Sequence, residues 1–209
     1  MIYEMRIQSL KPGSRDDYTK HFGAYAETCA PYARLWGSWH TDIGELDEVI
    51  EIWEFASLQD RFEAQIKMAA EPRCQWPPSG TEFLVSRRVQ ILEPIEGSPV
   101  WSSPRALGSI YELRLTTYEV DVINEVALGF THSLPGRTAI YPAAGLFKST
   151  LGTLHHHYQI YPFKDWNHRA EVRAEFYKTG VWPPPHASVP HPLTEVVRYM
   201  TPDPHSPLQ

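Results

Sequence analysis

The sequence predicts an α+β fold of two tandem ferredoxin-like β-α-β-β-α-β repeats whose antiparallel sheets form an α+β barrel. The pentapeptide Ile-Tyr-Glu-Met-Arg at 2–6 recurs as Ile-Tyr-Glu-Leu-Arg at 110–114. Each half also shows the order of strand and helix patterns that defines the split β-α-β motif. Such a unit covers one face of its sheet with helices, so two units in one chain can bury their uncovered faces against each other.

The duplication extends along most of the chain. Residues of the same type recur at the spacing of the pentapeptide: Gly44 and Gly152, Ile52 and Ile160, Phe55 and Phe163, and Arg61 and Arg169. Thr81-Glu82 recurs as Thr194-Glu195 at a longer spacing, which predicts insertions between the third and fourth strands of the second copy. Several matches in the same order indicate a duplicated unit, whereas a single match would arise by chance.

The duplication also predicts the domain organisation. We expect a first repeat over 1–94, a linker over 95–107, a second and diverged repeat over 108–201, and a Pro-rich tail over 202–209. Proline, glycine and serine concentrate in the linker, which is typical of a surface crossing. The tail is expected to be extended and weakly held.

The first strand and helix of the first repeat show clear periodicities. Residues 2–8 alternate Tyr3, Met5 and Ile7 with polar side chains, which is typical of a strand. A helix follows, and four residues at helical spacing share its apolar face: Tyr18, Phe22, Tyr25 and Cys29.

Two strands come next, at about 35–41 and 46–55, with a bend at 43–45. Ser57 then begins a helix with capping-box-like spacing. We expect its apolar stripe to be buried against the sheet: Leu58, Phe62, Ile66 and Ala69. A last strand is predicted over 82–92.

The second repeat follows the same plan. Its first helix carries an apolar stripe of four residues: Ile123, Val126, Phe130 and Leu134. Its second helix begins at Asp165 and carries a second stripe: Trp166, Ala170, Ala174 and Tyr177.

Charged residues occupy the alternate positions of both first strands. We expect the helices to cover the face of Tyr3, Met5 and Ile7, which places the charged side chains in the barrel interior: Glu4, Arg6, Glu112 and Arg114. Burying these charges unpaired would be costly, so they form an interior ion-pair network, line a ligand pocket, or both.

The third strand of the second repeat contains three consecutive histidines. By alternation, one face presents His155, His157, Gln159 and Tyr161, where the first repeat has Asp47, Val49, Glu51 and Trp53. Two histidines two residues apart on a strand can bind a metal together with a carboxylate from Glu4, Glu51 or Glu112. They can also act as a general acid or base, or lie at a solvated strand end.

Aromatic residues are abundant, with seven tryptophans and eleven tyrosines. Trp39 and His40 lie on the second strand, and the alternation does not show which of them faces inward. Such a content favours a pocket for a flat or apolar molecule. The sequence contains no Gly-rich phosphate loop, no Gly-x-Ser-x-Gly elbow and no Cys-x-x-Cys motif.

Composition limits the partners. The chain has 209 residues, of which 42% are hydrophobic, and a net charge of −6 with no basic cluster, which argues against nucleic acid or a membrane as partner. No apolar run approaches the roughly 18 residues of a membrane span. Cys29 and Cys74 are too few for a disulfide framework and no signal peptide is recognisable, so we expect a cytoplasmic protein in which Cys29 is a buried, unreactive thiol.

Several motifs of the first half resemble those of the NIPSNAP family. They are Ile-Tyr-Glu-Met-Arg at 2–6, Leu-Lys-Pro-Gly at 10–13, Gly-Ser-Trp-His-Thr-Asp-Ile-Gly-Glu-Leu at 37–46, and Ser-Leu-Gln-Asp-Arg at 57–61. The resemblance is fainter in the second half and is that of a tandem-repeat bacterial member. It implies the dimeric α+β barrel superfamily, which includes cofactor-free monooxygenases, isomerases, and haem-dependent dehydratases and dismutases. The histidine run departs from the family pattern.

The leading hypothesis is a small-molecule-binding protein that is a cofactor-independent isomerase, lyase or monooxygenase acting on a hydrophobic or aromatic carbonyl or phenolic compound. The predicted catalytic residues are His155, His157 and Arg114. The predicted ligand-binding residues are Glu4, Arg6, Glu112, Gln159, Tyr161, Trp53, Glu51, Trp39 and His40. We expect neither a cofactor nor a metal, and a homodimer stays open. The alternatives are a non-catalytic interaction module, with a filled barrel and an exposed apolar patch, and a metal- or haem-dependent enzyme that uses His155 and His157.

Overall fold

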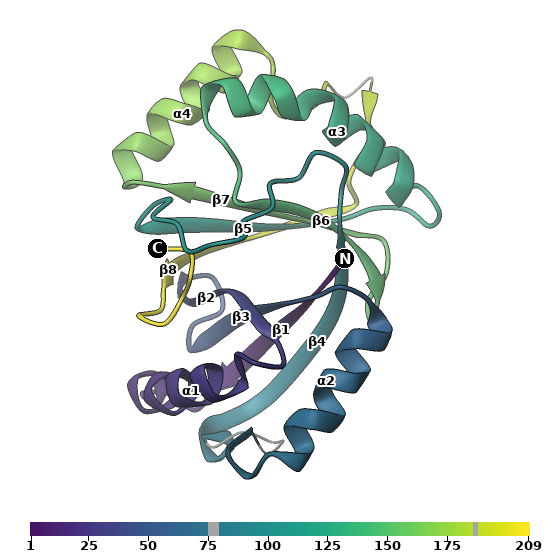
Figure 1. Cartoon of the computed structure of the whole chain (residues 1–209). Coiled ribbons are helices and arrows are strands. Elements are labelled where there is room, and N and C mark those ends of the chain that lie inside the picture. Colours follow the sequence, from purple (N-terminus) through teal and green to yellow (C-terminus); the bar gives the residue numbers. More distant parts are fainter. Residues whose placement is uncertain (75–79, 186–187) are drawn as a thin grey trace.

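Eight antiparallel strands from both repeats close one barrel, with a pair of helices packed on each of two opposite sides (Figure 1). The computed structural model describes residues 1–74, 80–185 and 188–209. The strand order around the barrel is β1-β3-β2-β8-β5-β7-β6-β4. The predicted α+β class and the tandem arrangement are therefore confirmed, and the barrel closes within a single chain.

The elements follow the predicted order in both repeats. The first repeat contains β1 (Ile2–Leu10), α1 (Arg15–Cys29), β2 (Arg34–Ile43), β3 (Glu48–Phe55), α2 (Leu58–Ala70), the short helices η1 (Pro72–Cys74) and η2 (Thr81–Phe83), and β4 (Leu84–Pro94). The second contains β5 (Ile110–Thr117), α3 (Ile123–Ile140), β6 (Gly145–Leu151), β7 (His156–Phe163), α4 (Trp166–Thr179) and β8 (Thr194–Pro202). Ser57 and Asp165 cap the second helix of each repeat, and each side chain accepts a hydrogen bond from the backbone N–H three residues on.

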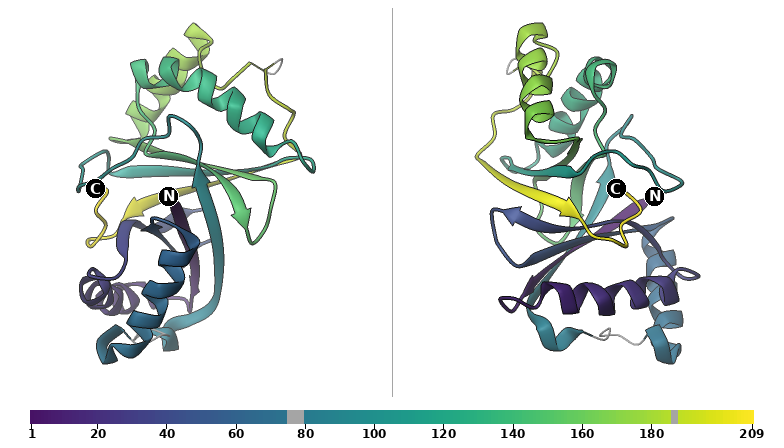
Figure 2. Two further views of the ribbon diagram at one scale, coloured as in Figure 1. Left: turned by 45° about the vertical axis from the view of Figure 1, so that its right-hand side comes forward. Right: turned by 90° about the vertical axis from the view of Figure 1, so that its left-hand side faces the viewer.

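Two junctions between the repeats close the barrel. At one junction β2 pairs with β8, which Figure 2 shows side by side, and at the other β4 pairs with β6. Since these four strands would otherwise be sheet edges, closure pairs backbone groups that neither repeat could satisfy alone.

Pairing within each repeat follows a single spacing of 108 residues. Met5 pairs with Ile52 and Gln90, and Leu113 pairs with Ile160 and Arg198. The fourth strands thus match without insertions, and the predicted insertions are wrong. Left-handed backbone positions recur at the same spacing, with φ values of 78° and 68° at Gly13 and Asp121, 118° and 99° at Gly44 and Gly152, and 56° and 63° at Asp47 and His155.

Most of the barrel interior is filled with apolar side chains, and the buried Glu48 carboxylate pairs there with Arg198 at 2.7 Å and with Arg88 at 2.5 Å. Strands of both repeats contribute large buried residues to it: Tyr3, Met5, Trp36, Trp39, Ile50, Ile52, Tyr111, Leu113, Phe147, Tyr158 and Ile160. The expectation that Tyr3, Met5 and Ile7 face the helices is therefore wrong, and so is the expectation that the charged residues of β1 and β5 line the interior. Alternation determines which residues share a face but not which face the helices cover.

Trp36 and Trp39 both face the interior although they are three residues apart. The register of β2 against β3 shifts between Leu35 and Gly37, which turns both indoles to one side. A Cβ atom at Gly37 would lie 2.0 Å from the Trp39 ring, so this close approach requires glycine.

The helices differ in how well their predicted stripes are buried. The stripe of α1 is buried as predicted, whereas Leu58, Phe62 and Ile66 of α2 are exposed and α2 packs through Ala64 and Met68. The predicted inner face of α2 is therefore wrong, because the helix is rotated so that Ala64 and Met68 face the sheet. The predicted stripe of α4 is wrong in the same way, since Trp166 and Tyr177 are exposed and the helix packs through Val172 and Phe176. None of the described helices combines the length and apolar character needed to cross a membrane.

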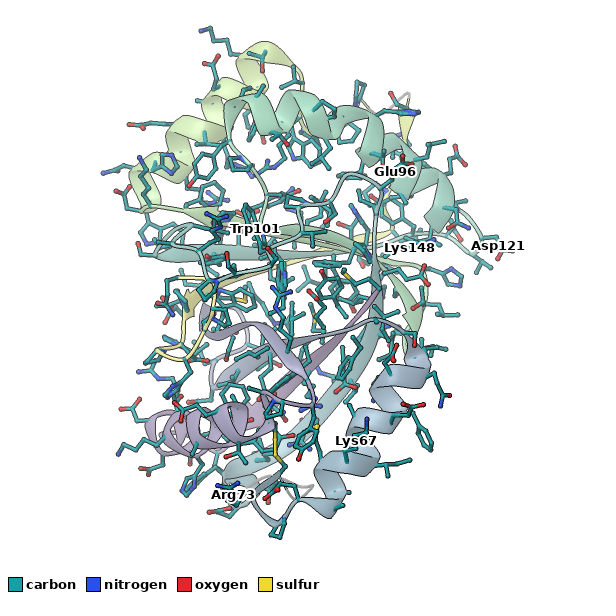
Figure 3. The ribbon with its side chains drawn as sticks, viewed as in Figure 1. Lys67, Arg73, Glu96, Trp101, Asp121 and Lys148 are labelled. Atoms are coloured by element: carbon teal, nitrogen blue, oxygen red, sulfur yellow. A yellow bond between two sulfur atoms is a disulfide. The ribbon has the colours of Figure 1, made fainter. Side chains whose placement is uncertain are left out.

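The linker and the C-terminal tail are packed against the barrel. Trp101 (Figure 3) donates a hydrogen bond from Nε1 to the Ala144 carbonyl oxygen at 2.7 Å. In the tail, Asp203 accepts a hydrogen bond from Ser38 Oγ at 2.7 Å, and Leu208 is buried in the barrel core. The expectation of a weakly held tail is wrong, because its buried groups bond to β2 and to the linker.

The two cysteines are joined. Cys29, the last residue of α1, forms a disulfide with Cys74 of η1. The prediction that Cys29 is a free thiol is therefore wrong. Disulfides persist in oxidising compartments, so this pairing gives no support to the expected cytoplasmic location.

Candidate functional site

Each repeat holds a buried cluster of one glutamate and two arginines between its sheet and its helices. In the second repeat, Arg114 Nη2 lies 2.6 Å from Glu112 Oε1, and Arg169 Nε lies 2.7 Å from Glu112 Oε2. In the first repeat, Glu4 forms the same two ion pairs, with Arg6 and Arg61. The i, i+2 spacing on the strand places the first two members on one face, and the fourth residue after the helix cap supplies the third.

The arginines determine the ionisation of both glutamates. Burial raises the pKa of Glu112, but the Arg114 and Arg169 guanidiniums lower it by more, so the pKa lies below its ordinary value. The pKa of Glu4 is lowered by Arg6 and Arg61 against the same opposing effect of burial. Both carboxylates are therefore ionised at neutral pH.

The first repeat adds a second buried carboxylate. Glu51 accepts hydrogen bonds from Tyr18 Oη at 2.5 Å, from Gln8 Nε2 at 3.3 Å and from Trp53 Nε1 at 3.3 Å. Burial raises its pKa, and Arg6 opposes this shift. The first cluster is thus a network in which several donors converge on Glu51.

The second repeat has an amide at the position equivalent to Glu51. Gln159 Oε1 accepts a hydrogen bond from Tyr161 Oη, and Gln159 Nε2 lies 3.4 Å from Thr116 Oγ1. Burial raises the pKa of Tyr161 to about 12, so its hydroxyl keeps its proton.

Arg137 of α3 is a buried cation at the centre of the second repeat. Its side chain is 2% exposed, and its guanidinium carbon lies 3.9 Å from the ring centroid of Tyr161, 4.8 Å from that of Phe176 and 5.1 Å from that of Trp182. Within residues 1–74, 80–185 and 188–209, its Nε and Nη2 have no hydrogen-bond partner. Burial lowers the pKa of Arg137 to about 10, which leaves it charged at pH 7.

A cavity of about 60 Å³ lies beside these groups, between the sheet and α3 and α4. Its walls combine charged and aromatic side chains: Glu112, Arg114, Arg137, Tyr161, Phe163, Arg173, Phe176, Tyr177, Trp182 and Pro183. Cavities that join an apolar wall to a few polar groups are typical ligand sites. The residues present can bind a compact molecule through guanidinium donors while aromatic rings enclose its apolar part.

The first repeat has an equivalent cavity of about 350 Å³ beside Arg6 and α2. Gln65, Met68 and Ala69 of α2 line it, where α4 has Arg173, Phe176 and Tyr177. The larger side chains of α4 narrow the second cavity and give it aromatic walls. The duplicated halves have therefore diverged most clearly at this place.

The structure groups some of the predicted site residues and separates others. Glu112, Arg114 and Tyr161 line the second cavity, with Gln159 bonded to Tyr161. Glu4, Arg6, Glu51 and Trp53 form the first cluster, in the repeat whose helices α1 and α2 lie on the opposite side of the barrel from α3 and α4 (Figure 1). The expected placement of these two groups inside one barrel is wrong, because the helices cover both.

Trp39 and His40 belong to neither cluster. Trp39 lies in the barrel interior, with its ring centroid 5.3 Å from that of Tyr111. His40 Nδ1 lies 3.1 Å from Asp203 Oδ1, at the contact between β2 and the tail. Their position supports a structural role in the barrel and its closure.

The predicted catalytic histidines lie beyond the walls of the second cavity. His157 is fully buried against Phe130, with ring centroids 4.3 Å apart, and its ring nitrogens have no hydrogen-bond partner in the part of the chain described. Burial lowers its pKa to about 3, so the imidazole is neutral at pH 7. His155 precedes β7 in a left-handed conformation, and its backbone oxygen accepts a hydrogen bond from Tyr118. The acid–base role of both histidines stays a prediction.

Metal-binding side chains do not gather around the histidines in the described part of the chain. Among the residues whose placement is described, no three His, Cys, Asp or Glu side chains come together as a metal site would require.

Sequence reasoning missed Arg137, Arg169 and Trp182. The repeat spacing contained a signal for the first, because Arg137 stands 108 residues after Cys29 on the buried stripe of the equivalent helix. An arginine on the apolar stripe of a helix predicts a buried cation. The alternation on the strands predicted His155 and His157 as site residues instead.

The fold and the repeated clusters define a duplicated α+β barrel protein with a cavity between the sheet and the helices of each repeat. The chain belongs to the NIPSNAP family, whose profile matches residues 3–99 and 111–207. Protein NipSnap homolog 1 of Danio rerio is 26% identical over 218 residues, which span 100% of this chain and 77% of that protein. Protein NipSnap homolog 2 of Homo sapiens is 24% identical over 221 residues, covering 100% and 75%.

A solved structure has a similar fold. A candidate monooxygenase from Lactobacillus acidophilus aligns over 97% of this chain and 93% of its own, with a TM-score of 0.67 and 14% sequence identity. At this identity the similarity shows the shared fold and carries no information on the reaction.

Proposed function

We propose that the protein binds a small organic molecule in the cavity between the sheet and helices α3 and α4 of its second repeat. The observation that carries this proposal is Arg137, a buried guanidinium beside a cavity with aromatic walls, two of whose nitrogens have no hydrogen-bond partner among the described residues. Unmade hydrogen bonds of a buried charge cost stability, and a ligand that accepts them would recover that free energy.

The second repeat suits a ligand better than the first. In the first repeat, side chains of the chain itself donate hydrogen bonds to the buried Glu51 carboxylate. In the second repeat, Arg114 Nε lacks a hydrogen-bond partner among the described residues, as do two nitrogens of Arg137. Three donor nitrogens of two arginines that line one cavity therefore lack a hydrogen-bond partner among the described residues.

As an enzyme, the protein would act on a hydrophobic or aromatic carbonyl or phenolic compound without a cofactor. Arg114 and Arg137 would stabilise negative charge on an oxygen atom of the bound compound, and a site that favours the anion lowers the pKa of a bound phenol or enol. His157 as the base would have to act at a pKa of about 3, which makes it weakly basic. The geometry therefore supports charge stabilisation more directly than proton abstraction.

Three tryptophans make the binding test specific to one place. Trp182 lies at the second cavity, Trp53 in the first cluster and Trp39 in the barrel interior. Titration of the ¹⁵N-labelled protein with aromatic aldehydes, ketones and phenols should shift the Trp182 indole N–H resonance and leave the other two unchanged. Shifts confined to Trp39 or Trp53, or no shift with any of these compounds or with an aromatic carboxylate, would contradict the proposal.

Compounds that bind also allow a test for chemistry. Spectra of the compound incubated with the protein under air and under argon separate isomerisation or cleavage, which proceed in both, from oxygenation, which requires air. A compound that binds and stays unchanged in both would indicate a binding protein without catalysis.

Two observations favour a second candidate function, that of an interaction module. The barrel interior is filled, and α2 exposes an apolar stripe of Leu58, Phe62 and Ile66. This function predicts that no compound shifts Trp182, and that association with another copy or another protein is lost in Phe62→Glu. A homodimer formed through this stripe would appear as a concentration-dependent mass in sedimentation experiments.

A further inference from the structure

We infer that the cavity of the second repeat is selective for a flat organic anion, a carboxylate, which binds the Nε–Nη2 edge of Arg137. The inference rests on the proposed function and adds the chemical class of the ligand.

The unpartnered nitrogens of Arg137 have the geometry that a carboxylate needs. Nε and Nη2 lie along one edge of the planar guanidinium, so their N–H bonds are parallel and match the two oxygens of a carboxylate. The rings of Tyr161, Phe176 and Trp182 pack around the guanidinium carbon and supply no strong acceptor. This edge is therefore the part of the guanidinium that still lacks an acceptor among the described residues, and Arg137 lines the cavity.

The sites of the two repeats differ in the charge of their buried side chains. Two differences inside the equivalent sites alter charge in the same direction: Glu51 of the first repeat is Gln159 in the second, and Cys29 is Arg137. The first removes a buried carboxylate and the second adds a buried guanidinium. Both make the second site more favourable for an anion.

The other charged groups near the site do not cancel this effect. Glu112 is already shared by Arg114 and Arg169, and Arg173 lies at the cavity on α4. One difference runs the other way, since Glu195 stands where the first repeat has Arg87. Glu195 is exposed on β8 and is absent from the cavity walls. Its negative charge interacts with Arg114, where solvent and salt weaken it, and it is not among the charges that act on Arg137.

The volume limits how much of the ligand is enclosed. About 60 Å³ corresponds to roughly two water molecules at their liquid volume of about 30 Å³ each. The cavity thus encloses a carboxylate and the atoms next to it, while a larger body would extend past Arg173 and Tyr177 of α4.

Benzoate and benzamide are suitable probes, because they share a shape and differ in charge. We expect benzoate to shift the Trp182 indole resonance and to bind at least ten-fold more tightly than benzamide. Arg137→Gln should weaken benzoate binding at least ten-fold and change benzamide binding less than two-fold. Gln159→Glu, which restores the carboxylate of the first repeat, should also weaken benzoate binding. The matched change in the other repeat, Glu51→Gln, should leave benzoate binding within two-fold of the wild type.

The results separate this inference from the proposed function. Equal affinities for benzoate and benzamide, or unchanged benzoate binding in Arg137→Gln, would overturn the inference that the cavity selects an anion through Arg137. A neutral carbonyl compound that shifts Trp182 while benzoate does not would overturn the selectivity and leave the binding function standing. If no compound of either kind shifts Trp182, both are wrong. Each variant is first compared with the wild type by its indole spectrum, so that a loss of fold is recognised.

Discussion

Arg137 of α3 occupies the position that Cys29 occupies in α1, and the two residues give equivalent places in the repeats opposite characters. Cys29 is covalently joined to Cys74 and packs in an apolar core. Arg137 places a charge among aromatic rings beside a cavity. Both repeats thus contain a Glu–Arg–Arg cluster, and they differ in the helix residue that packs near it, which is Cys29 in α1 and Arg137 in α3.

The buried charge of Arg137 predicts an unusual effect on stability. Arg137→Met removes a guanidinium whose Nε and Nη2 are unpartnered among the described residues and retains most of its packing. We expect the free energy of unfolding without ligand to stay equal or to rise by up to about 2 kcal/mol, because replacing a poorly compensated buried charge by an apolar group is often stabilising. Urea unfolding of the variant and the wild type measures this difference in the free energy of unfolding. A loss above about 1 kcal/mol would mean that Arg137 is a structural residue.

Loss of the Glu112 carboxylate, by contrast, should lower the stability of the protein. Glu112→Gln leaves Arg114 and Arg169 without their shared carboxylate, so we expect a loss of about 3 kcal/mol at pH 7. The pKa of Glu112 is lowered in the folded state, so its contribution is full above the unfolded pKa of about 4.3 and is lost as the pH falls through the folded pKa. Urea unfolding at pH 7 and near pH 3 should therefore show the gap between variant and wild type narrowing. A gap independent of pH would contradict the assignment.

The buried His157 predicts a second pH dependence. Its pKa of about 3 in the folded state lies below the unfolded value of about 6.5, so its contribution to stability is present above pH 6.5 and declines as the pH falls. His157→Val introduces the residue type of the equivalent Val49 and should flatten the stability profile between about pH 6.5 and 4.5. An NMR titration should show the His157 imidazole neutral throughout that range. A titration near pH 6.5 would show that the ring is accessible to water.

The disulfide predicts a redox-dependent stability. A cross-link between residues 45 apart lowers the conformational entropy of the unfolded chain, which stabilises the folded state by about 4 kcal/mol on the loop-entropy model. Reduction with dithiothreitol, or Cys74→Ser, should lower the free energy of unfolding by about that amount, and the reductant should have no further effect on Cys74→Ser. Equal stability of oxidised and reduced protein would contradict the cross-link.

The exposed stripe of α2 gives a direct test of the helix orientation. Phe62 is 57% exposed and Met68 is 3% exposed on the same helix. Phe62→Ala should change the free energy of unfolding by less than about 0.5 kcal/mol, and Met68→Ala should lower it by about 2–4 kcal/mol. Thermal or urea unfolding compares the two, and the reverse order would place the predicted stripe of Leu58, Phe62 and Ile66 against the sheet.

Local patterns predicted the elements of this fold because each had its own signal. The alternation of 2–8, the cap at Ser57 and the repeated pentapeptide all lie within a few residues and need no tertiary information. The same alternation could not show which face of β1 the helices cover. That choice depends on closure of the barrel, whose interior is filled by large apolar side chains of both repeats.

The candidate site was predicted in part for the same reason. Glu112, Arg114, Gln159 and Tyr161 were placed on one face correctly, since strand alternation determines co-facial residues. Arg137 and Trp182 come from a helix and a later loop, and only the packing of α3 and α4 on the sheet brings them to that face. His157 shares the face but lies against Phe130, a separation that the sequence pattern does not contain.

The central claim is that the ligand site lies between the sheet and the helices of the second repeat, outside the barrel. Anomalous diffraction from a crystal soaked with 4-bromobenzoate tests it most directly. The account predicts a bromine peak beside α4 with the carboxylate on the Nε–Nη2 edge of Arg137. A peak inside the barrel near Trp39, or one only at the first-repeat cavity beside Arg6, would contradict it.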